Sequence, residues 1–344
     1  MLRYRLPAHF STFRARFRKF ANGLGGPRKA ALVVAAVLCL VVLTTGAVHL
    51  KTAALTRVWG WLFNTDCRDC GRQGARGASS RRAQSQGAGA GAGGTYTVID
   101  APGACTSALK GTIGVSINGA GNVAGTYLDS NNAAHGFLDV GGTITEINAP
   151  NAGTGSTQGT FVLSIDAAGN VTGMYADSNN MYHGFVLPAG GSITEFDVSG
   201  AGTGGHRGTI PLSINNGVIA GTYVTGTPST TSVYHGFVRA TDGTITSFDP
   251  PGAGTGDVQG TQSAAINSAG AITGTYLDSD KARHGYLRSA GGTFTAPIDD
   301  SDGAGGTVPF AIDTAGDITG TYADAKGLDH GFRALPRPRV QAGA

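Results

Sequence analysis

The sequence predicts an all-β repeat protein, a five-bladed β-propeller, preceded by one apolar helix. His-Gly-Phe or His-Gly-Tyr recurs five times at intervals of 48, 52, 49 and 46 residues, beginning at His135, His183, His235, His284 and His330. Within each interval, short runs of β-branched and aromatic residues alternate with Gly, Asn and Asp, as in strands and turns. Four strands in about 48 residues make one propeller blade.

Each unit contains four candidate strands whose residues return from unit to unit. A Thr-x-Thr strand lies at residues 95–100, 143–148, 192–197, 244–249 and 293–299. An apolar strand is centred on Ser-Ile-Asn or its variants, at residues 116–118, 164–166, 213–215, 265–267 and 311–313. A Gly-Thr-Tyr strand and the His-Gly-Phe strand complete the unit.

The lengths of the connections predict the order of the strands. Tight turns such as Gly141-Gly142 follow the His-Gly-Phe strand, as a two-residue hairpin with positive φ requires. The longest regular connection, for example residues 149–160, follows the Thr-x-Thr strand. A propeller has one long crossover per blade, from its outer strand to the inner strand of the next. The Ser-Ile-Asn strand is therefore predicted to be innermost and the Thr-x-Thr strand outermost.

The two ends of the repeat are predicted to complete each other. The last His-Gly-Phe strand has no Thr-x-Thr strand after it, and residues 95–100 have no unit before them. We expect residues 95–100 to complete the last blade and close the ring, which leaves no long bare edge. An open β-solenoid is the alternative.

The N-terminal region is predicted to hold the repeats outside a membrane. Residues 1–29 form a basic tail with eight Lys or Arg and no acid, and the 21 residues 30–50 carry no charge. A helix of that length reaches roughly 30 Å, enough to span a bilayer. The positive-inside rule leaves the tail in the cytoplasm and the repeats in the periplasm or at the cell surface. A cleaved signal peptide, which would release a secreted protein, is the alternative.

Residues 51–94 are predicted to be a flexible stalk of Gly, Ala, Ser and Arg, residues 95–335 the propeller, and residues 336–344 a disordered tail. Residues 1–94 hold 15 basic and 2 acidic residues, so residues 95–344 hold 10 basic and 20 acidic ones. This acidic balance argues against nucleic acid as a partner of the repeats.

The cysteines give little information about function. Cys67 and Cys70 on the stalk are either a disulfide formed outside the cytoplasm or incidental thiols, and Cys105 has no evident partner.

The repeated histidines are interpreted as structural. A residue that returns once per unit usually serves packing, with His bonded to a neighbouring backbone group and Phe filling the gap between blades. The Gly between them permits close approach of another backbone. A metal-binding or acid–base role for these histidines is the alternative.

Polar turns between the Gly-Thr-Tyr and His-Gly-Phe strands are the candidate binding elements. They read Asp-Ser-Asn-Asn at residues 129–132 and 177–180, vary near Asp278 and Asp324, and give way to a longer loop at residues 225–233. Propeller geometry places these turns and the long crossovers on one face, called here the rim. The candidate binding residues of the turns are Asp129, Asn131, Asn132, Asp177, Asn179, Asn180, Asp278, Asp280 and Asp324.

No cofactor is expected, with Ca²⁺ as a weak alternative. Aspartate and asparagine oxygens suit calcium, and its candidate ligands are Asp129, Asp177, Asp278 and Asp324. The same residues form Asx turns without any ion, and none of these loops has the twelve-residue calcium pattern. One crossover position varies between units, as is typical of a ligand-facing or merely solvated rim, and holds Lys110, Gln158, Arg207 and Gln259.

Units that read SINGAGNVAGTYLDSNNAAHGF, as at residues 116–137, resemble the probable extracellular repeats of the HAF family. The resemblance covers residues 95–335. The unit is a variant, because Gly stands where the family name has Ala. The resemblance implies an exported β-repeat protein, and since the family has no general reaction it implies no catalytic residues.

The predicted function is recognition or scaffolding, in which the rim binds an unidentified protein or glycan outside the cytoplasm. A calcium-dependent adhesion module is an alternative. A glycan-active hydrolase or lyase would need two converging carboxylates. Asp166 and Asp313 follow inner strands, but other units have Asn there and both lie at the tight-turn end. No catalytic constellation is visible, so an enzyme is not expected.

Overall fold

The computed structural model describes residues 96–106, 111–227, 230–295 and 297–335. All of these residues belong to one unit of the chain, within Thr56–Ala344. These residues form 19 strands, and no helix among them could span a membrane. The predicted tail, apolar helix and stalk at residues 1–94, and the predicted tail at residues 336–344, lie outside the described ranges.

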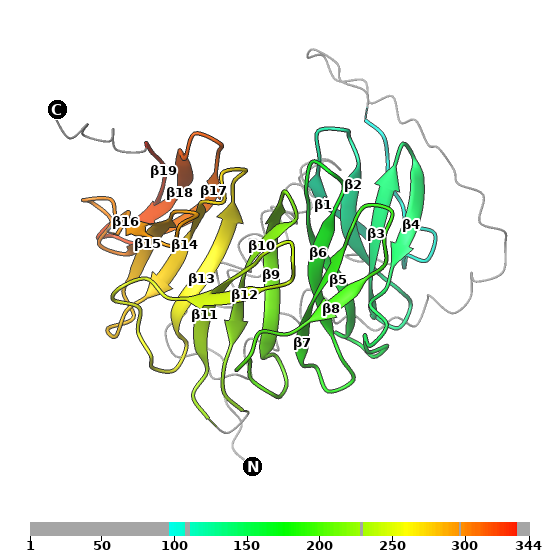
Figure 1. Ribbon diagram of the computed structural model, residues 1–344, viewed down its shortest axis with the longest axis horizontal. Coiled ribbons are helices and arrows are strands. Elements are labelled where there is room, and N and C mark those ends of the chain that lie inside the picture. Colours follow the sequence, from blue (N-terminus) through cyan, green and yellow to red (C-terminus); the bar gives the residue numbers. More distant parts are fainter. Residues whose placement is uncertain (1–95, 107–110, 228–229, 296, 336–344) are drawn as a thin grey trace, which may run out of the picture. The chain divides into compact units, whose positions relative to one another are not determined.

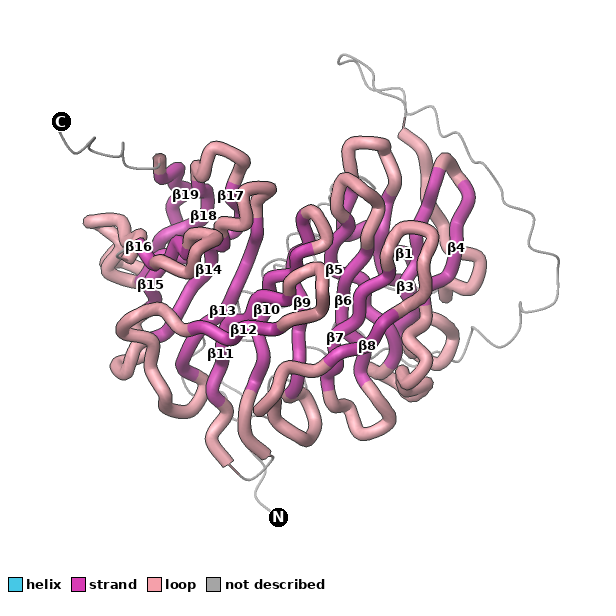
Figure 2. The backbone as a smooth tube through the Cα atoms, viewed as in Figure 1, coloured by secondary structure: helices cyan, strands magenta, loops and turns pink. Residues whose placement is uncertain are grey.

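The strands follow the sequence repeat in consecutive units, four units of four strands and a last unit of three, and Figures 1 and 2 show the units side by side in chain order. The first unit contains β1 (Thr112–Ile117), β2 (Val123–Leu128), β3 (Ala134–Val140) and β4 (Thr143–Ile147). The second contains β5 (Gly159–Ile165), β6 (Val171–Ala176), β7 (Tyr182–Leu187) and β8 (Thr194–Phe196). The third contains β9 (Gly208–Asn215), β10 (Val218–Val224), β11 (Val233–Arg239) and β12 (Ile245–Phe248). The fourth contains β13 (Gln259–Ile266), β14 (Ile272–Leu277), β15 (Arg283–Arg288) and β16 (Phe294–Thr295).

Each of these four units is an antiparallel sheet in chain order, which confirms the all-β repeat with four strands per unit. The first strand of one unit lies near the first strand of the next, and the fourth strand pairs only with the third. The predicted inner and outer strands are therefore confirmed. The order of the strands follows from the connections. Short turns join neighbouring antiparallel strands as hairpins within a unit, and the long crossover leads to the first strand of the next unit.

The fifth unit has three strands, β17 (Gly306–Ile312), β18 (Ile318–Ala323) and β19 (Asp329–Ala334), in a separate sheet. Residues 96–100 are described but form no strand, and β19 pairs only with β18. Ile99 packs instead against Tyr127 and Phe137 of the first unit, and the adjacent Ala101 N–H donates to Thr112 Oγ1 at 2.8 Å. The closed five-bladed ring stays a prediction.

Cys105 is buried and, although the sequence showed no evident partner, it is disulfide-bonded.

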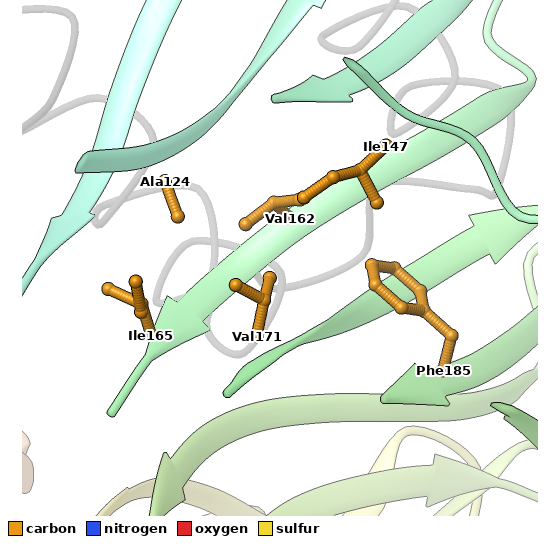
Figure 3. Close-up of a cluster of buried hydrophobic side chains, with 6 residues drawn as sticks. All are labelled: Ala124, Ile147, Val162, Ile165, Val171 and Phe185. Carbon is orange, nitrogen blue, oxygen red and sulfur yellow. The ribbon is translucent and has the colours of Figure 1, made fainter. Parts of the chain in front are cut away.

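Apolar side chains fill the spaces between consecutive units. One cluster joins Ala124 and Ile147 of the first unit to Val162, Ile165 and Phe185 of the second (Figure 3). The Phe of His-Gly-Phe is completely buried at Phe137, Phe185 and Phe237, with Tyr286 at 1 % exposure in the fourth unit. The prediction that this aromatic ring fills the gap between blades is confirmed.

The glycine of His-Gly-Phe faces the following unit and leaves no room for a side chain. A Cβ at Gly184 would lie 2.8 Å from the Phe196 ring and 2.9 Å from Pro211 on the next unit's inner strand. At Gly136 it would lie 2.7 Å from Val162. The predicted close approach is confirmed, and it explains why this position holds Gly rather than Ala.

Replacing Gly184 by Ala is expected to destabilise the fold, because the added methyl group overlaps two packed neighbours. Overpacking of this kind costs about 1–3 kcal/mol. Chemical denaturation monitored by fluorescence measures the change. Gly119→Ala is the matched control, because Gly119 has no atom within 4 Å of an added Cβ. Equal stability of the two variants would contradict this packing.

Candidate functional site

The rim turns are Asx turns closed by their aspartate. Asp129 Oδ1 accepts the N–H groups of Asn131 at 2.8 Å and Ala133 at 2.9 Å. The Asn132 backbone has a φ of 64°, which asparagine tolerates better than most residues. The same two backbone bonds recur at Asp177, Asp278 and Asp324. Each of these loops is therefore an Asx turn, and each aspartate keeps its second oxygen for another partner.

That partner is the histidine of His-Gly-Phe, which stacks on the tyrosine of the neighbouring strand. In all five units the two ring centroids lie 4.8–5.1 Å apart at interplanar angles of 15–26°. The stack follows from the antiparallel register, which places Tyr127 opposite His135 on β2 and β3. In four units His Nε2 lies 3.2–3.8 Å from Oδ2 of the turn aspartate. The third unit has the longer loop at residues 225–233 instead.

The other ring nitrogen contacts the last residue of the Thr-x-Thr segment of its unit. His183 Nδ1 lies 2.8 Å from Asp197, His235 Nδ1 2.7 Å from Asp249, and His284 Nδ1 2.6 Å from Asp299. In the first unit the partner is Asn148, at 2.9 Å. The predicted structural role fits this arrangement, but the predicted backbone partner was wrong. The histidine bonds side chains, since strand pairing already satisfies the nearby backbone groups.

In the second unit the Tyr-His-Asp cluster lines a pocket of about 520 Å³, called here the second-unit pocket. Asn151, on the crossover from the first unit, donates to Glu195 through its N–H at 3.0 Å and its Nδ2 at 2.5 Å. The side chain of Glu195 is thereby held between two units. The pocket is lined by Asn151, Tyr175, Asp177, Ser178, His183, Glu195, Phe196 and Asp197.

Hydrogen bonds and burial shift the pKa values of three side chains in the second-unit pocket. The bond to Asp197 is the main cause of a raised pKa at His183. Burial would raise the pKa of Asp177, but the N–H groups of Met181 and Asn179 outweigh it and hold that pKa low. Burial, together with nearby Glu195, raises the pKa of the Tyr175 hydroxyl, which remains neutral. No Lys or Arg is among the lining residues.

The equivalent positions of the other units differ. The first unit has Glu146, which accepts from Tyr127 Oη at 2.6 Å, but its crossover has Gly103 where the second-unit pocket has Asn151. The third unit has Ser247 in place of Glu195. In the fourth unit an 80 Å³ hollow is lined by Pro250, Pro251, Tyr276, Tyr286, Phe294, Thr295 and Pro297. Sequence reasoning missed Glu195 and Asn151, because a contact between units is invisible in a repeat read one unit at a time.

The predicted crossover residues serve the loops. Gln158 accepts from the Gly155 N–H at 2.9 Å and donates to the Ser178 carbonyl at 3.0 Å, and Gln259 makes the same two bonds in the fourth unit. Arg207 Nε donates to Ser232 Oγ at 3.1 Å. These bonds join crossovers to rim turns, which confirms that both lie on one face. Lys110 lies outside the described residues.

The calcium candidates lie in four different units, each facing one histidine. The side chains of Asn131 and Asn179 return to the turn aspartate at 3.5 and 3.3 Å, and Asp280 contributes its N–H to Asp278. Asn132 and Asn180 each bury an Oδ1 without a partner among the described atoms. Within the described ranges no group of three or more His, Cys, Asp or Glu is arranged to hold a metal ion.

No protein-family model matches the chain, and no curated protein sequence matches it. Among solved structures, a triple mutant of AofleA from Arthrobotrys oligospora is 17 % identical with a TM-score of 0.37, covering 70 % of this chain and 72 % of its own. A mutant Aleuria aurantia lectin bound to α-methyl-L-fucoside is 13 % identical with a TM-score of 0.38, covering 63 % and 71 %. The BP39L lectin from Burkholderia pseudomallei is 12 % identical with a TM-score of 0.38, covering 72 % and 76 %. Likenesses this distant assign no ligand to this chain.

His183 and His206 are expected to titrate in opposite directions from the ordinary histidine pKa. Asp197 raises the pKa of His183, whereas burial lowers the pKa of His206, whose Nδ1 lies 2.8 Å from the Tyr182 hydroxyl. NMR titration of the two imidazoles measures both values. Asp197→Asn should lower the pKa of His183 and leave that of His206 unchanged. A His183 pKa that does not respond would contradict the pairing.

The charge of Asp197 should stabilise the fold in a pH-dependent way. Because the pKa of His183 is raised on folding, the stabilisation is complete below the ordinary value of about 6.5 and is lost as pH rises through the raised pKa. Asp197→Asn keeps a hydrogen-bond acceptor, as Asn148 does in the first unit. Its loss of stability in denaturant should be larger at about pH 5.5 than at about pH 9. Asp280→Asn, which removes an exposed carboxylate remote from His183, is the control.

Proposed function

We propose that this chain is a recognition protein that binds a carbohydrate through the second-unit pocket. The single observation that carries the proposal is a 520 Å³ hollow whose lining includes three carboxylates, an amide, a histidine and the aromatic residue Phe196. Binding sites place a few fixed polar groups beside apolar surface. Carboxylate and amide oxygens accept hydrogen bonds from hydroxyl groups, and a phenyl ring packs against the C–H face of a sugar.

The fixed orientation of these groups suits recognition. Glu195 is held by Asn151, Asp197 by His183, and the Asp177 carboxylate by its own turn. Side chains fixed before the ligand arrives lose little conformational entropy on binding. The absence of Lys and Arg from the lining disfavours phosphate or sulfate groups, which need cationic partners. A neutral sugar with several hydroxyl groups is the ligand class that fits.

We do not propose an enzyme. Asp166, considered from the sequence as a channel carboxylate, is buried and accepts from Asn170 and from the Gly217 N–H of the third unit, both at 2.9 Å. It links two units and does not face an open site. In the second-unit pocket each carboxylate already has a hydrogen-bond partner in the protein. These bonds fix the direction of the carboxylate, which suits ligand binding better than the transfer of a proton to a substrate.

In the proposed architecture the five units form a propeller that residues 30–50 tether to a membrane through the stalk at residues 51–94. The rim then faces the periplasm or the cell exterior, where glycans are available. Protein binding through the same rim remains the second candidate, and membership of the HAF repeat family is compatible with either. A calcium-dependent adhesion module is less favoured, because one oxygen of each turn aspartate is already occupied by two backbone N–H groups.

Glu195→Ala in the full-length chain, purified in mild detergent, is expected to weaken glycan binding at least tenfold. The loss of a charged hydrogen-bond acceptor costs roughly 1.5–3 kcal/mol, and about 1.4 kcal/mol corresponds to a factor of ten. A glycan array identifies the ligand and titration calorimetry measures the change. Glu146→Ala is the matched control, because Glu146 holds the same strand position in the first unit without a crossover asparagine.

Each arm of this experiment has a clear consequence. Binding that survives in the Glu195 variant as in the Glu146 variant would exclude the second-unit pocket. Binding that disappears on chelation of Ca²⁺ would favour the adhesion module. An array without any hit, for a chain whose melting temperature shows that it is folded, would overturn carbohydrate recognition and favour a protein partner.

A further inference from the structure

The last unit leaves bare a surface that every preceding unit buries. The second strand of each unit has a residue that faces the next unit's inner strand. At Ala124, Thr172, Ala220 and Thr273 this residue is completely buried, whereas Thr319 of the last unit is exposed. The glycine of His-Gly-Phe shows the same contrast. An added Cβ at Gly136, Gly184, Gly236 or Gly285 would collide with neighbours, whereas at Gly331 it would meet no described atom within 4 Å.

The first unit leaves bare the opposite surface. Ile117, near the end of the inner strand, is 67 % exposed. Its equivalents in the next three units, which face the preceding unit, are only 4–6 % exposed, namely Ile165, Ile214 and Ile266. Val123 is half-buried, whereas its equivalents Val171, Ile219, Ile272 and Ile318 are at most 2 % exposed. The two bare surfaces are thus the two halves of the interface that joins all other consecutive units.

Residues 96–101 already occupy the place of a fourth strand beside the first unit. The Ala101 N–H donates to Thr112 Oγ1 at 2.8 Å, as Ala149 donates to Thr160 at 2.9 Å and Val198 to Thr209 at 3.0 Å. Ile99 and Ala101 pack with Phe137, as Ile147 packs with Phe185 in the next interface. The segment lacks pairing with a third strand, since residues 96–100 form no strand, and its Tyr96 and Val98 side chains are 72 % and 48 % exposed.

We propose that the chain closes on itself, with residues 96–100 pairing antiparallel with β19 and the first unit covering the fifth. The register of the first unit, Gly136 opposite Ile147 and Leu138 opposite Thr145, places Gly331 opposite Ile99 and Arg333 opposite Thr97. Asp100 then reaches the position of Asp197 and faces His330. The closure assembles a fifth cluster from both ends of the repeat, with Tyr322 and Asp324 contributed by the last unit.

The occupant of the bare interface is the chain's own first unit. Both halves are present once in each chain, and the Ala101 anchor keeps residues 96–100 on the first unit, so one movement covers both surfaces. Pairing with a second copy would leave a free half at each end and extend into an open filament. Closure within one chain has the advantage of a high effective concentration. Closure of the chain is independent of carbohydrate binding, because it is tested by which cysteines form a disulfide.

Cysteines introduced at Thr97 and Arg333 in the full-length chain test the register. Directly opposite residues on paired strands have side chains on one face and lie within reach of a disulfide. Mild oxidation should yield a disulfide between the two new cysteines within a single chain, identified by mass spectrometry of proteolytic fragments. The Val98→Cys, Arg333→Cys pair is the control, because its side chains would point to opposite faces. It should yield much less of the corresponding product.

A second measurement does not depend on disulfide formation. Closure would place Ile99 and the first unit's inner strand against Gly331. Gly331→Ala should therefore destabilise the fold to the same degree as Gly184→Ala. Stability like that of Gly119→Ala, or a Thr97–Arg333 disulfide found between two chains or no more often than the control, would overturn closure within one chain.

Discussion

The contact between consecutive units is the constraint on which the rest of the structure depends. A sheet of four short strands has two faces, and an isolated sheet of this size cannot bury enough apolar surface to be stable. Here Gly184 lets Phe196 and Pro211 approach one side of the strand, while Phe185 fills the space on the other side. A unit with a neighbour on each side therefore buries both faces of its sheet. Units at the ends of the array carry the cost of any missing neighbour, as the exposure of Ile117 shows.

The polar clusters follow from the same alternation of faces. His183 lies two residues before Phe185 and points to the same side of its strand, so the histidine reaches the rim where the phenyl ring reaches the core. There it stacks on Tyr175 and bonds Asp197. Polar groups that lose contact with water must find partners within the protein. The Tyr, His and Asp side chains supply one another with partners. This structural role explains why they recur from unit to unit, and no catalytic role is needed to explain it.

The proposed binding site lies where the repeat is broken. The second-unit pocket differs from the first unit by the crossover residue Asn151, which bonds Glu195 across the boundary between units, and the third unit also lacks the glutamate. In the fourth unit prolines and Phe294 line the corresponding hollow, so that place is apolar. A scaffold of nearly identical units thus presents different surfaces, because loop residues change at little cost to the packing beneath.

The sequence by itself determined the repeat, the four strands of each unit and their inner-to-outer order, because period, alternation and turn residues are local properties of the chain. It also determined the Asx turns and the role of the glycine in His-Gly-Phe. Only the tertiary structure decided that the histidines bond side chains rather than backbone, that Gln158 and Gln259 clamp loops, and that Asn151 meets Glu195. These partners come from other strands or other units, and their distances depend on how sheets stack. A one-dimensional pattern does not contain that information.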